Sequence, residues 1–113
     1  MKKSLFTIIL ASVCVTAFLL EDYEYTWRIQ VAASKSPIAK NAKIYTALWD
    51  VEGVKGEDGY YRYFVGKYET FYQAKEDLTK VQEAGYKSAY IICIHKGKRM
   101  SVDDAIMEIY GEE

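Results

Sequence analysis

Histidine and cysteine are scarce in this chain of 113 residues, which holds one histidine and two cysteines. Structural zinc sites take about four ligands, mostly from these two residue types, so we expect no metal site. No motif indicates another cofactor. Cys14 falls in the N-terminal apolar stretch, which leaves Cys93 without a partner for a disulfide in the rest of the chain. Cys93 follows the apolar residues 89–92, a setting that predicts a buried structural thiol.

An excess of basic residues is also missing. The formal net charge is −1, and without Lys2 and Lys3 the chain carries 13 basic and 16 acidic residues. Proteins that bind nucleic acid gain much of their affinity from Lys and Arg side chains that neutralise phosphates. We therefore expect no nucleic-acid partner. A neutral or weakly charged ligand fits this composition better.

Carboxylates in an arrangement suited to glycoside hydrolysis are lacking as well. Such a catalytic pair faces across a cleft, roughly 5–9 Å apart. The acidic pairs 57–58 and 103–104 are direct chain neighbours, the first in a predicted turn and the second at a predicted helix start. A thiol nucleophile would need a neighbour that lowers its pKa. His95 lies two residues beyond Cys93 and would point to the same strand face, but the apolar neighbours of Cys93 favour a buried structural thiol. We predict a domain without catalytic residues.

Repeats and low-complexity linkers are absent from the sequence, and the length fits one domain. Half of the residues are hydrophobic, which excludes a disordered chain. Eleven tyrosines are many for this size. Their apolar rings and polar tips suit a half-buried sheet or a wet binding surface.

The N-terminus has the pattern of a secretory signal. Lys2 and Lys3 form a positive start, residues 5–13 are apolar, and residues 15–17 offer a small-residue cleavage site after Ala17. The sequence thus predicts a signal peptide over 1–17 and a single domain over 18–113.

Two other leaders are weighed against this one. The apolar stretch 5–20 is shorter than the roughly 20 residues of a spanning helix, which disfavours an uncleaved anchor. Cys14 would suit a lipoprotein leader, but the branched Val13 stands where a small residue is wanted. All three interpretations place the domain outside the cytoplasm, in the periplasm or cell envelope, with a membrane contact only if the leader is retained.

Alternation of apolar and polar residues predicts four strands. They cover 25–33, 51–55, 60–65 and 88–95. In the first, Trp27, Ile29 and Val31 point one way, and Arg28, Gln30 and Ala32 the other. The turn residues 56–59 join the second and third strands into a hairpin.

Helix signals lie between the strands. Ser36 and Pro37 can start a helix that ends between Ile44 and Leu48. Thr70 with Gln73 forms a capping box for a helix over 70–84. After a turn at 96–98, Ser101 can cap a short last helix.

This βαββαβ order predicts an α+β, ferredoxin-like (RNP-like) fold: a four-stranded antiparallel sheet with two helices on one face, plus a short C-terminal helix. The other face would stay open. It would carry Arg28, Gln30, Tyr60, Arg62, Phe64, Tyr90 and Ile92. RNA-binding domains share this fold, but the predicted export and the acidic charge argue against that function.

Two segments resemble the signatures of SPOR domains. Residues 28–34, Arg-Ile-Gln-Val-Ala-Ala-Ser, are similar to the first-strand pattern, and residues 59–66, Gly-Tyr-Tyr-Arg-Tyr-Phe-Val-Gly, to the third-strand pattern. Ala74 and the pair Gly85-Tyr86 complete the set, so the resemblance covers about residues 25–100.

The resemblance implies binding of peptidoglycan glycan strands that have lost their stem peptides, with many members acting at the division septum. It implies a ligand site on the open sheet face, with the roles of Gln30, Tyr60, Arg62 and Tyr90 carried over by position. Arg28 could join Arg62 in binding a lactyl carboxylate. Ala33 departs from the Ser of some members. A module that binds envelope proteins rather than glycan remains the alternative.

Export gives the first test. Mass spectrometry of the protein from its native envelope should show a chain that begins near Phe18, because the signal is expected to be cut after Ala17. An intact Met1 in a soluble cytoplasmic fraction would contradict the signal peptide.

Overall fold

A computed structural model describes residues 23–111, so the predicted signal peptide lies outside the described residues. Over the described range the chain forms, in order, β1 (Thr26–Ser34), α2 (Ile44–Ala47), β2 (Val51–Lys55), β3 (Tyr61–Tyr68), α3 (Phe71–Glu83), β4 (Tyr90–His95), β5 (Lys98–Ser101) and α4 (Val102–Tyr110). None of the helices described here is long and apolar enough to cross a membrane.

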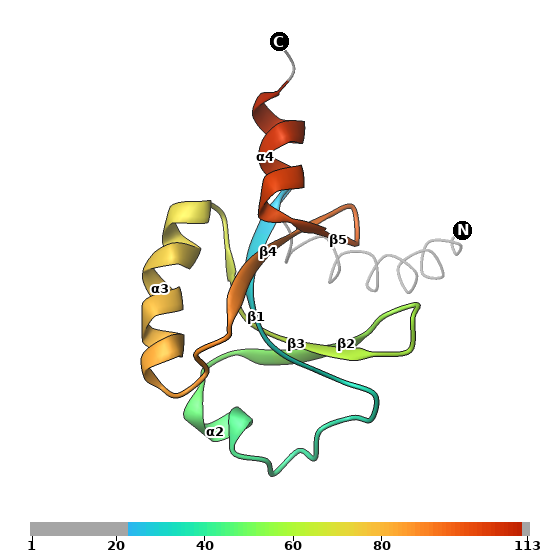
Figure 1. The fold of residues 1–113 in the computed structure, drawn as a ribbon, viewed down its shortest axis with the longest axis vertical. Coiled ribbons are helices and arrows are strands. Elements are labelled where there is room, and N and C mark those ends of the chain that lie inside the picture. The colour runs from blue at the N-terminus through green and yellow to red at the C-terminus, as the bar shows by residue number, and fades with distance from the viewer. Residues whose placement is uncertain (1–22, 112–113) are drawn as a thin grey trace, which may run out of the picture.

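The strands form one twisted sheet in the order β2-β3-β1-β4-β5, and every neighbouring pair is antiparallel (Figure 1). The predicted α+β class with an antiparallel sheet is confirmed. The predicted number of four strands is wrong, because β5 adds a fifth strand beside β4. The cause is a tight turn. Lys96 (φ 54°) and Gly97 (φ 77°) both take positive φ between paired His95 and Lys98, as a two-residue hairpin requires.

The first predicted helix is also wrong in extent. Only Ile44–Ala47 is helical, whereas the prediction started the helix at Pro37. Residues 35–43 form an irregular segment with bends and turns at its two ends, and the backbone N–H of Ile38 donates to the hydroxyl of Tyr63 over 2.7 Å. Ile38, Ala42 and Tyr45 still pack against the core. The apolar spacing that predicted a helix face therefore belongs mostly to a loop, from which Ile38 and Ala42 reach the core.

The second helix forms as predicted. Gln73 donates its backbone N–H to Oγ1 of Thr70 over 3.1 Å, and Oε1 of Gln73 accepts from the N–H of Thr70 over 3.2 Å. These two bonds satisfy N–H groups that the helix start leaves unpaired. Ala74 and Val81 are buried on the inner face of α3.

The hydrophobic core lies between the sheet and the helices. Figure 1 shows α3 along one side of the sheet, with α2 and α4 at opposite ends. The buried residues of this core are Trp27, Ile29, Ile44, Leu48, Tyr63, Val65, Ala74, Val81, Ala89, Ile91, Cys93 and Ala105. Burial of a side chain such as Ile29 contributes about 1.5–3 kcal/mol. Because α2, α3 and α4 all contribute to one core, they fix which sheet face is left for other contacts.

A β-bulge interrupts β1 between Gln30 and Ala32. Beyond it, Ala32 pairs with Tyr63 and Ala33 pairs with Arg62. The predicted strict alternation placed Ala32 on the face of Gln30. The bulge shifts the pattern by one residue, so Ala33 shares that face with Arg62 instead.

Cys93 is fully buried, and burial raises the pKa of its thiol to about 11, with a smaller contribution from Glu108. His95 does not activate it, because Nδ1 of His95 lies 2.7 Å from the carbonyl oxygen of Glu24 and its ring stacks on Tyr25.

The burial of Cys93 can be tested by chemical labelling. The folded protein should react with a thiol reagent far more slowly than the denatured one. We expect Cys93→Ala to cost about 1 kcal/mol of stability in chemical denaturation. Rapid labelling of the native thiol would contradict its burial.

Candidate functional site

The face of the sheet opposite the helices collects the predicted site residues. In the β1–β4 register Arg28 pairs with Ile92 and Gln30 with Tyr90. Paired residues in neighbouring strands point to the same face. By the same register, Phe64 and Arg62 of β3 and Arg99 of β5 lie on this face. We call the set Arg28, Gln30, Arg62, Phe64, Tyr90, Ile92 and Arg99 the polar sheet face.

The centre of the polar sheet face is not open, which corrects the prediction of a solvent-facing sheet. Four of its side chains are buried: Arg28, Gln30, Phe64 and Ile92. The long side chains of Arg28 and Arg99 bend into contacts on the sheet, where they bind Gly66 and Gln30. Tyr90 remains 46% exposed. A ligand would therefore meet the rim of this face first.

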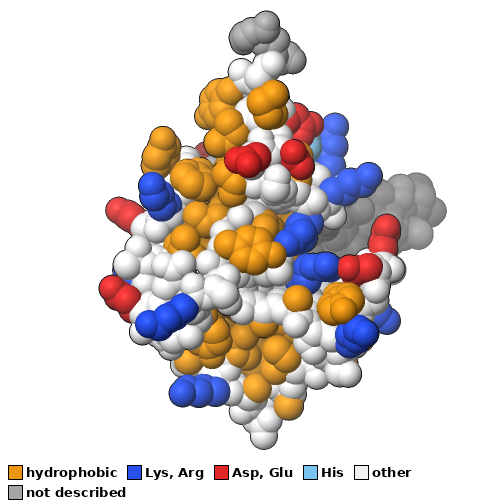
Figure 2. Space-filling view, viewed as in Figure 1, with side chains coloured by type: hydrophobic (Ala, Val, Ile, Leu, Met, Phe, Trp, Pro, Cys, Tyr) orange, Lys and Arg blue, Asp and Glu red, His pale blue; other side chains and the backbone are white. Residues whose placement is uncertain are grey.

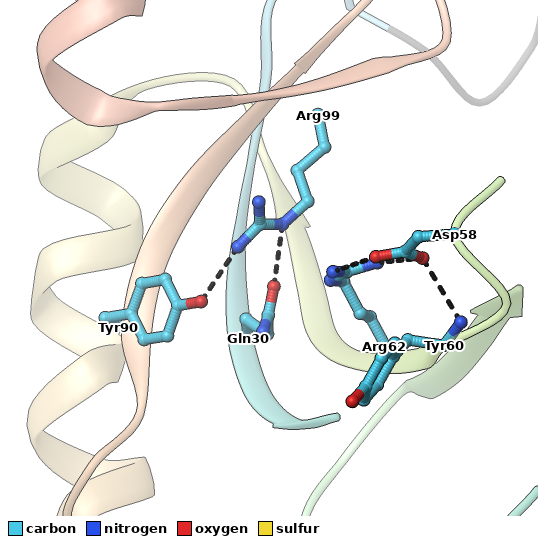
Figure 3. Close-up of polar contacts among 6 residues, drawn as sticks. All are labelled: Gln30, Asp58, Tyr60, Arg62, Tyr90 and Arg99. Carbon is cyan, nitrogen blue, oxygen red and sulfur yellow. Dashed lines mark hydrogen bonds and ion pairs between the residues drawn. The ribbon is translucent and has the colours of Figure 1, made fainter. Parts of the chain in front are cut away.

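Arg99 of β5 holds both Gln30 of β1 and Tyr90 of β4. Nε of Arg99 donates to Oε1 of Gln30 over 2.8 Å, and Nη2 of Arg99 donates to the hydroxyl of Tyr90 over 2.8 Å (Figure 3). We call Gln30, Tyr90 and Arg99 the Gln30 cluster. It joins β1, β4 and β5, so three strands position one group of polar atoms.

Arg62 is held by the turn between β2 and β3. Its Nη1 and Nη2 donate to the two carboxylate oxygens of Asp58 over 3.1 and 2.8 Å. The backbone N–H of Tyr60 donates to Oδ1 of Asp58 over 3.1 Å, and the Arg62 guanidinium lies 5.8 Å from the centre of the Tyr60 ring (Figure 3). The hydrogen bonds from Arg62 and then from Tyr60 lower the pKa of Asp58 to about 2.

Arg28 lies deeper than the other candidates. Its Nε donates to the carbonyl oxygen of Gly66 over 2.7 Å, its Nη1 bonds Oε1 of Glu52 at 2.6 Å, and its guanidinium lies 5.3 Å from the centre of the Phe64 ring. Within residues 23–111, Nη2 of Arg28 is the buried side-chain atom that finds no hydrogen-bond partner. Removal of Glu52 would leave the buried cation uncompensated.

A family model for the SPOR domain matches residues 23–92 of this chain. The chain belongs to the SPOR family. SPOR domains are known for peptidoglycan binding, occur in envelope proteins and act as binding modules. The matched range includes Gln30, Tyr60, Arg62 and Tyr90, whereas β5 and α4 lie beyond it. A search of curated proteins and a search of solved structures gave no match.

Sequence reasoning missed two residues of the polar arrangement. Arg99 was missed because the predicted sheet ended at the strand 88–95. The available signal was Gly97 in the turn after that strand, because a two-residue hairpin needs positive φ, which Gly adopts readily. Sequence reasoning took Asp58 as a turn residue and as half of a rejected carboxylate pair with Glu57, and did not pair it with Arg62. Its position four residues before Arg62, across a turn that ends at Gly59, was the signal for an ion pair.

Figure 2 shows hydrophobic side chains in several groups, with basic and acidic side chains between them. A hollow of about 330 Å³ is lined by Thr79, Gln82, Glu83 and Lys87, at the end of α3, and none of these residues belongs to the polar sheet face. Among the described residues, no group of three or more His, Cys, Asp or Glu side chains is placed to hold a metal ion.

The ion pair of this SPOR domain gives a test by pH titration. Because the pKa of Asp58 is lowered in the folded state, its contribution to stability is present above the ordinary value of 3.8 and is lost as the pH falls towards 2. Carbon NMR of the Asp58 carboxyl should give a pKa near 2 in the wild type and a clearly higher one in Arg62→Ala. An unchanged pKa in that variant would show that the pair does not form in solution.

Proposed function

We propose that this SPOR domain binds peptidoglycan glycan strands that lack stem peptides, without catalysis, through the polar sheet face and the adjoining Tyr60. The observation that carries the proposal is the common face of Gln30, Tyr90 and Arg62, which lie on three strands and whose roles the resemblance to SPOR domains implies. Cell division or envelope remodelling is the process in which such strands arise, and the predicted export fits that setting.

The two tyrosines at the rim suit the apolar faces of sugar rings. Tyr90 is 46% exposed on β4, and Tyr60 is partly exposed beside β3. Aromatic rings present a flat apolar surface with a polar tip, so they can stack on a sugar while the hydroxyl stays wet. Because β1 lies between β4 and β3, the two rings flank the strand that carries Gln30.

The polar groups suit the substituents of the glycan. The amide of Gln30 can bond hydroxyl and acetamide groups. Removal of the stem peptide leaves a lactyl carboxylate on each muramic acid, and a guanidinium binds a carboxylate by charge-assisted hydrogen bonds. Arg28 is the deepest member of the proposed site, and its buried Nη2 has no hydrogen-bond partner among the described residues.

Sedimentation with purified sacculi tests this function. Binding of the wild-type domain should rise after an amidase removes the stem peptides. Tyr60→Ala, Arg62→Ala and Tyr90→Ala should each lower the affinity roughly five- to hundredfold, the equivalent of about 1–3 kcal/mol. Their thermal midpoints should change little, because these side chains are partly exposed. Gln30→Ala should also bind less, but with some loss of stability, because Gln30 is buried and bonded to Arg99.

Two exposed residues of α3 provide the controls. Lys75→Ala and Glu83→Ala should bind like the wild type, because α3 lies on the opposite side of the sheet. If the rim variants bind treated sacculi as well as these controls do, the polar sheet face is not the glycan site. A wild-type domain that ignores treated sacculi would favour the alternative of a protein-binding module.

A further inference from the structure

Arg99 differs from the other two arginines of the polar sheet face in its charge environment. Arg28 forms an ion pair with Glu52 and Arg62 one with Asp58. For Arg99, the part of the chain that the structure describes provides only neutral partners, the Gln30 carbonyl and the Tyr90 hydroxyl. Its side chain is exposed. Of the three arginines on the polar sheet face, Arg99 is thus the one whose charge no carboxylate within residues 23–111 neutralises.

The bonds of Arg99 also fix the orientation of its two partners. A guanidinium only donates hydrogen bonds, so the group of Gln30 that faces Nε of Arg99 is the carbonyl oxygen. The amide nitrogen of Gln30 then points away from Nε of Arg99, and the hydrogen bond of the Gln30 side chain found within residues 23–111 is the one made by its carbonyl oxygen. The Tyr90 hydroxyl accepts from Arg99 and so keeps its own proton free to donate.

The Gln30 cluster therefore presents mainly donors to a ligand. These donors are the remaining N–H groups of Arg99, the amide N–H groups of Gln30 and the O–H of Tyr90. An ionised carboxylate only accepts hydrogen bonds and carries the complementary charge. The chemistry of the cluster matches that group better than it matches a hydroxyl or an ammonium group.

We infer that Arg99, with Gln30 and Tyr90, receives a carboxylate of the ligand, and that this residue of β5 sets the preference of the domain for carboxylate-bearing glycan. The inference rests on the proposed function, because it names the ligand group bound at that site. Arg99 lies outside the matched range 23–92, so the family comparison does not assign it a role. Arg62, already held by both oxygens of Asp58, is not the carboxylate receptor in this scheme.

Two forms of one probe test the inference. The first is amidase-treated sacculi, which carry lactyl carboxylates; the second is the same material after its carboxylates have been converted to methylamides with a carbodiimide and methylamine. The wild type should bind the first form at least tenfold more tightly than the second, because a charge-assisted hydrogen bond is lost. Arg99→Gln should reduce this ratio to about one, with the thermal midpoint preserved.

Lys98→Gln is the matched control. It removes the same charge from the neighbouring residue of β5, whose side chain points to the other face, so the ratio should persist. Arg62→Gln should also retain the ratio. Gln30→Glu keeps the size of the side chain and a partner for Arg99 but supplies a carboxylate of its own. Gln30→Glu should therefore lower binding of the amidase-treated sacculi with intact carboxylates at least tenfold, while the fold stays intact.

The outcomes separate the two proposals. A wild type that fails to bind either form overturns both the proposed function and this inference. A wild type that binds both forms equally overturns the inference alone. The inference also fails if Arg99→Gln or Gln30→Glu behaves like the wild type, or if Arg62→Gln abolishes the ratio that Arg99→Gln retains.

Discussion

The antiparallel pairing of β1 with β3 on one edge and with β4 on the other fixes the two faces of the sheet. On the helix side this strand places Trp27 and Ile29 in the core, and on the opposite side it places Arg28 and Gln30. Both layers follow from the period of two along a strand. A slip of one residue in either pairing would bury the polar pair in the core, so the core packing and the polar face depend on the same register.

The three arginines of the polar sheet face differ in whether a carboxylate of the chain neutralises their charge. Arg28 and Arg62 each have a carboxylate partner from the β2–β3 hairpin region, Glu52 and Asp58. Arg99 reaches across β4 to β1 and is bound only to neutral groups. The hairpin side of the face is thus internally neutralised. The β5 side retains positive charge, although the chain as a whole is slightly acidic.

Local signals with a specific mechanism allowed the most accurate predictions from the sequence. The capping box of Thr70 and Gln73 located α3, and the alternation around Ile29 located β1. The length of the first helix was wrong because Ile38 and Ala42 reach the core from a loop that Tyr63 anchors, and apolar spacing alone does not distinguish these cases. Periodicity likewise gives no sign of the bulge in β1.

For the site, the resemblance predicted which strands carry the candidate residues. It did not predict which side chains these residues bond to. The ion pair of Asp58 with Arg62 and the bonds of Arg99 to Gln30 and Tyr90 depend on side chains brought together by turns. Gln30 is buried although it lies on the outer face, so a sequence pattern that places a polar residue on that face does not predict how much of it is exposed.

The central claim is that the ligand lies on the polar sheet face. NMR of the labelled domain titrated with a soluble disaccharide-repeat fragment of peptidoglycan that lacks stem peptides tests it most directly. We expect the largest shifts at the Gln30 side-chain amide, the Tyr90 ring and the Arg99 Nε–H, with little change around Thr79 and Lys87 at the end of α3. Shifts confined to α3 and α4, or none at a saturating concentration, would contradict the claim.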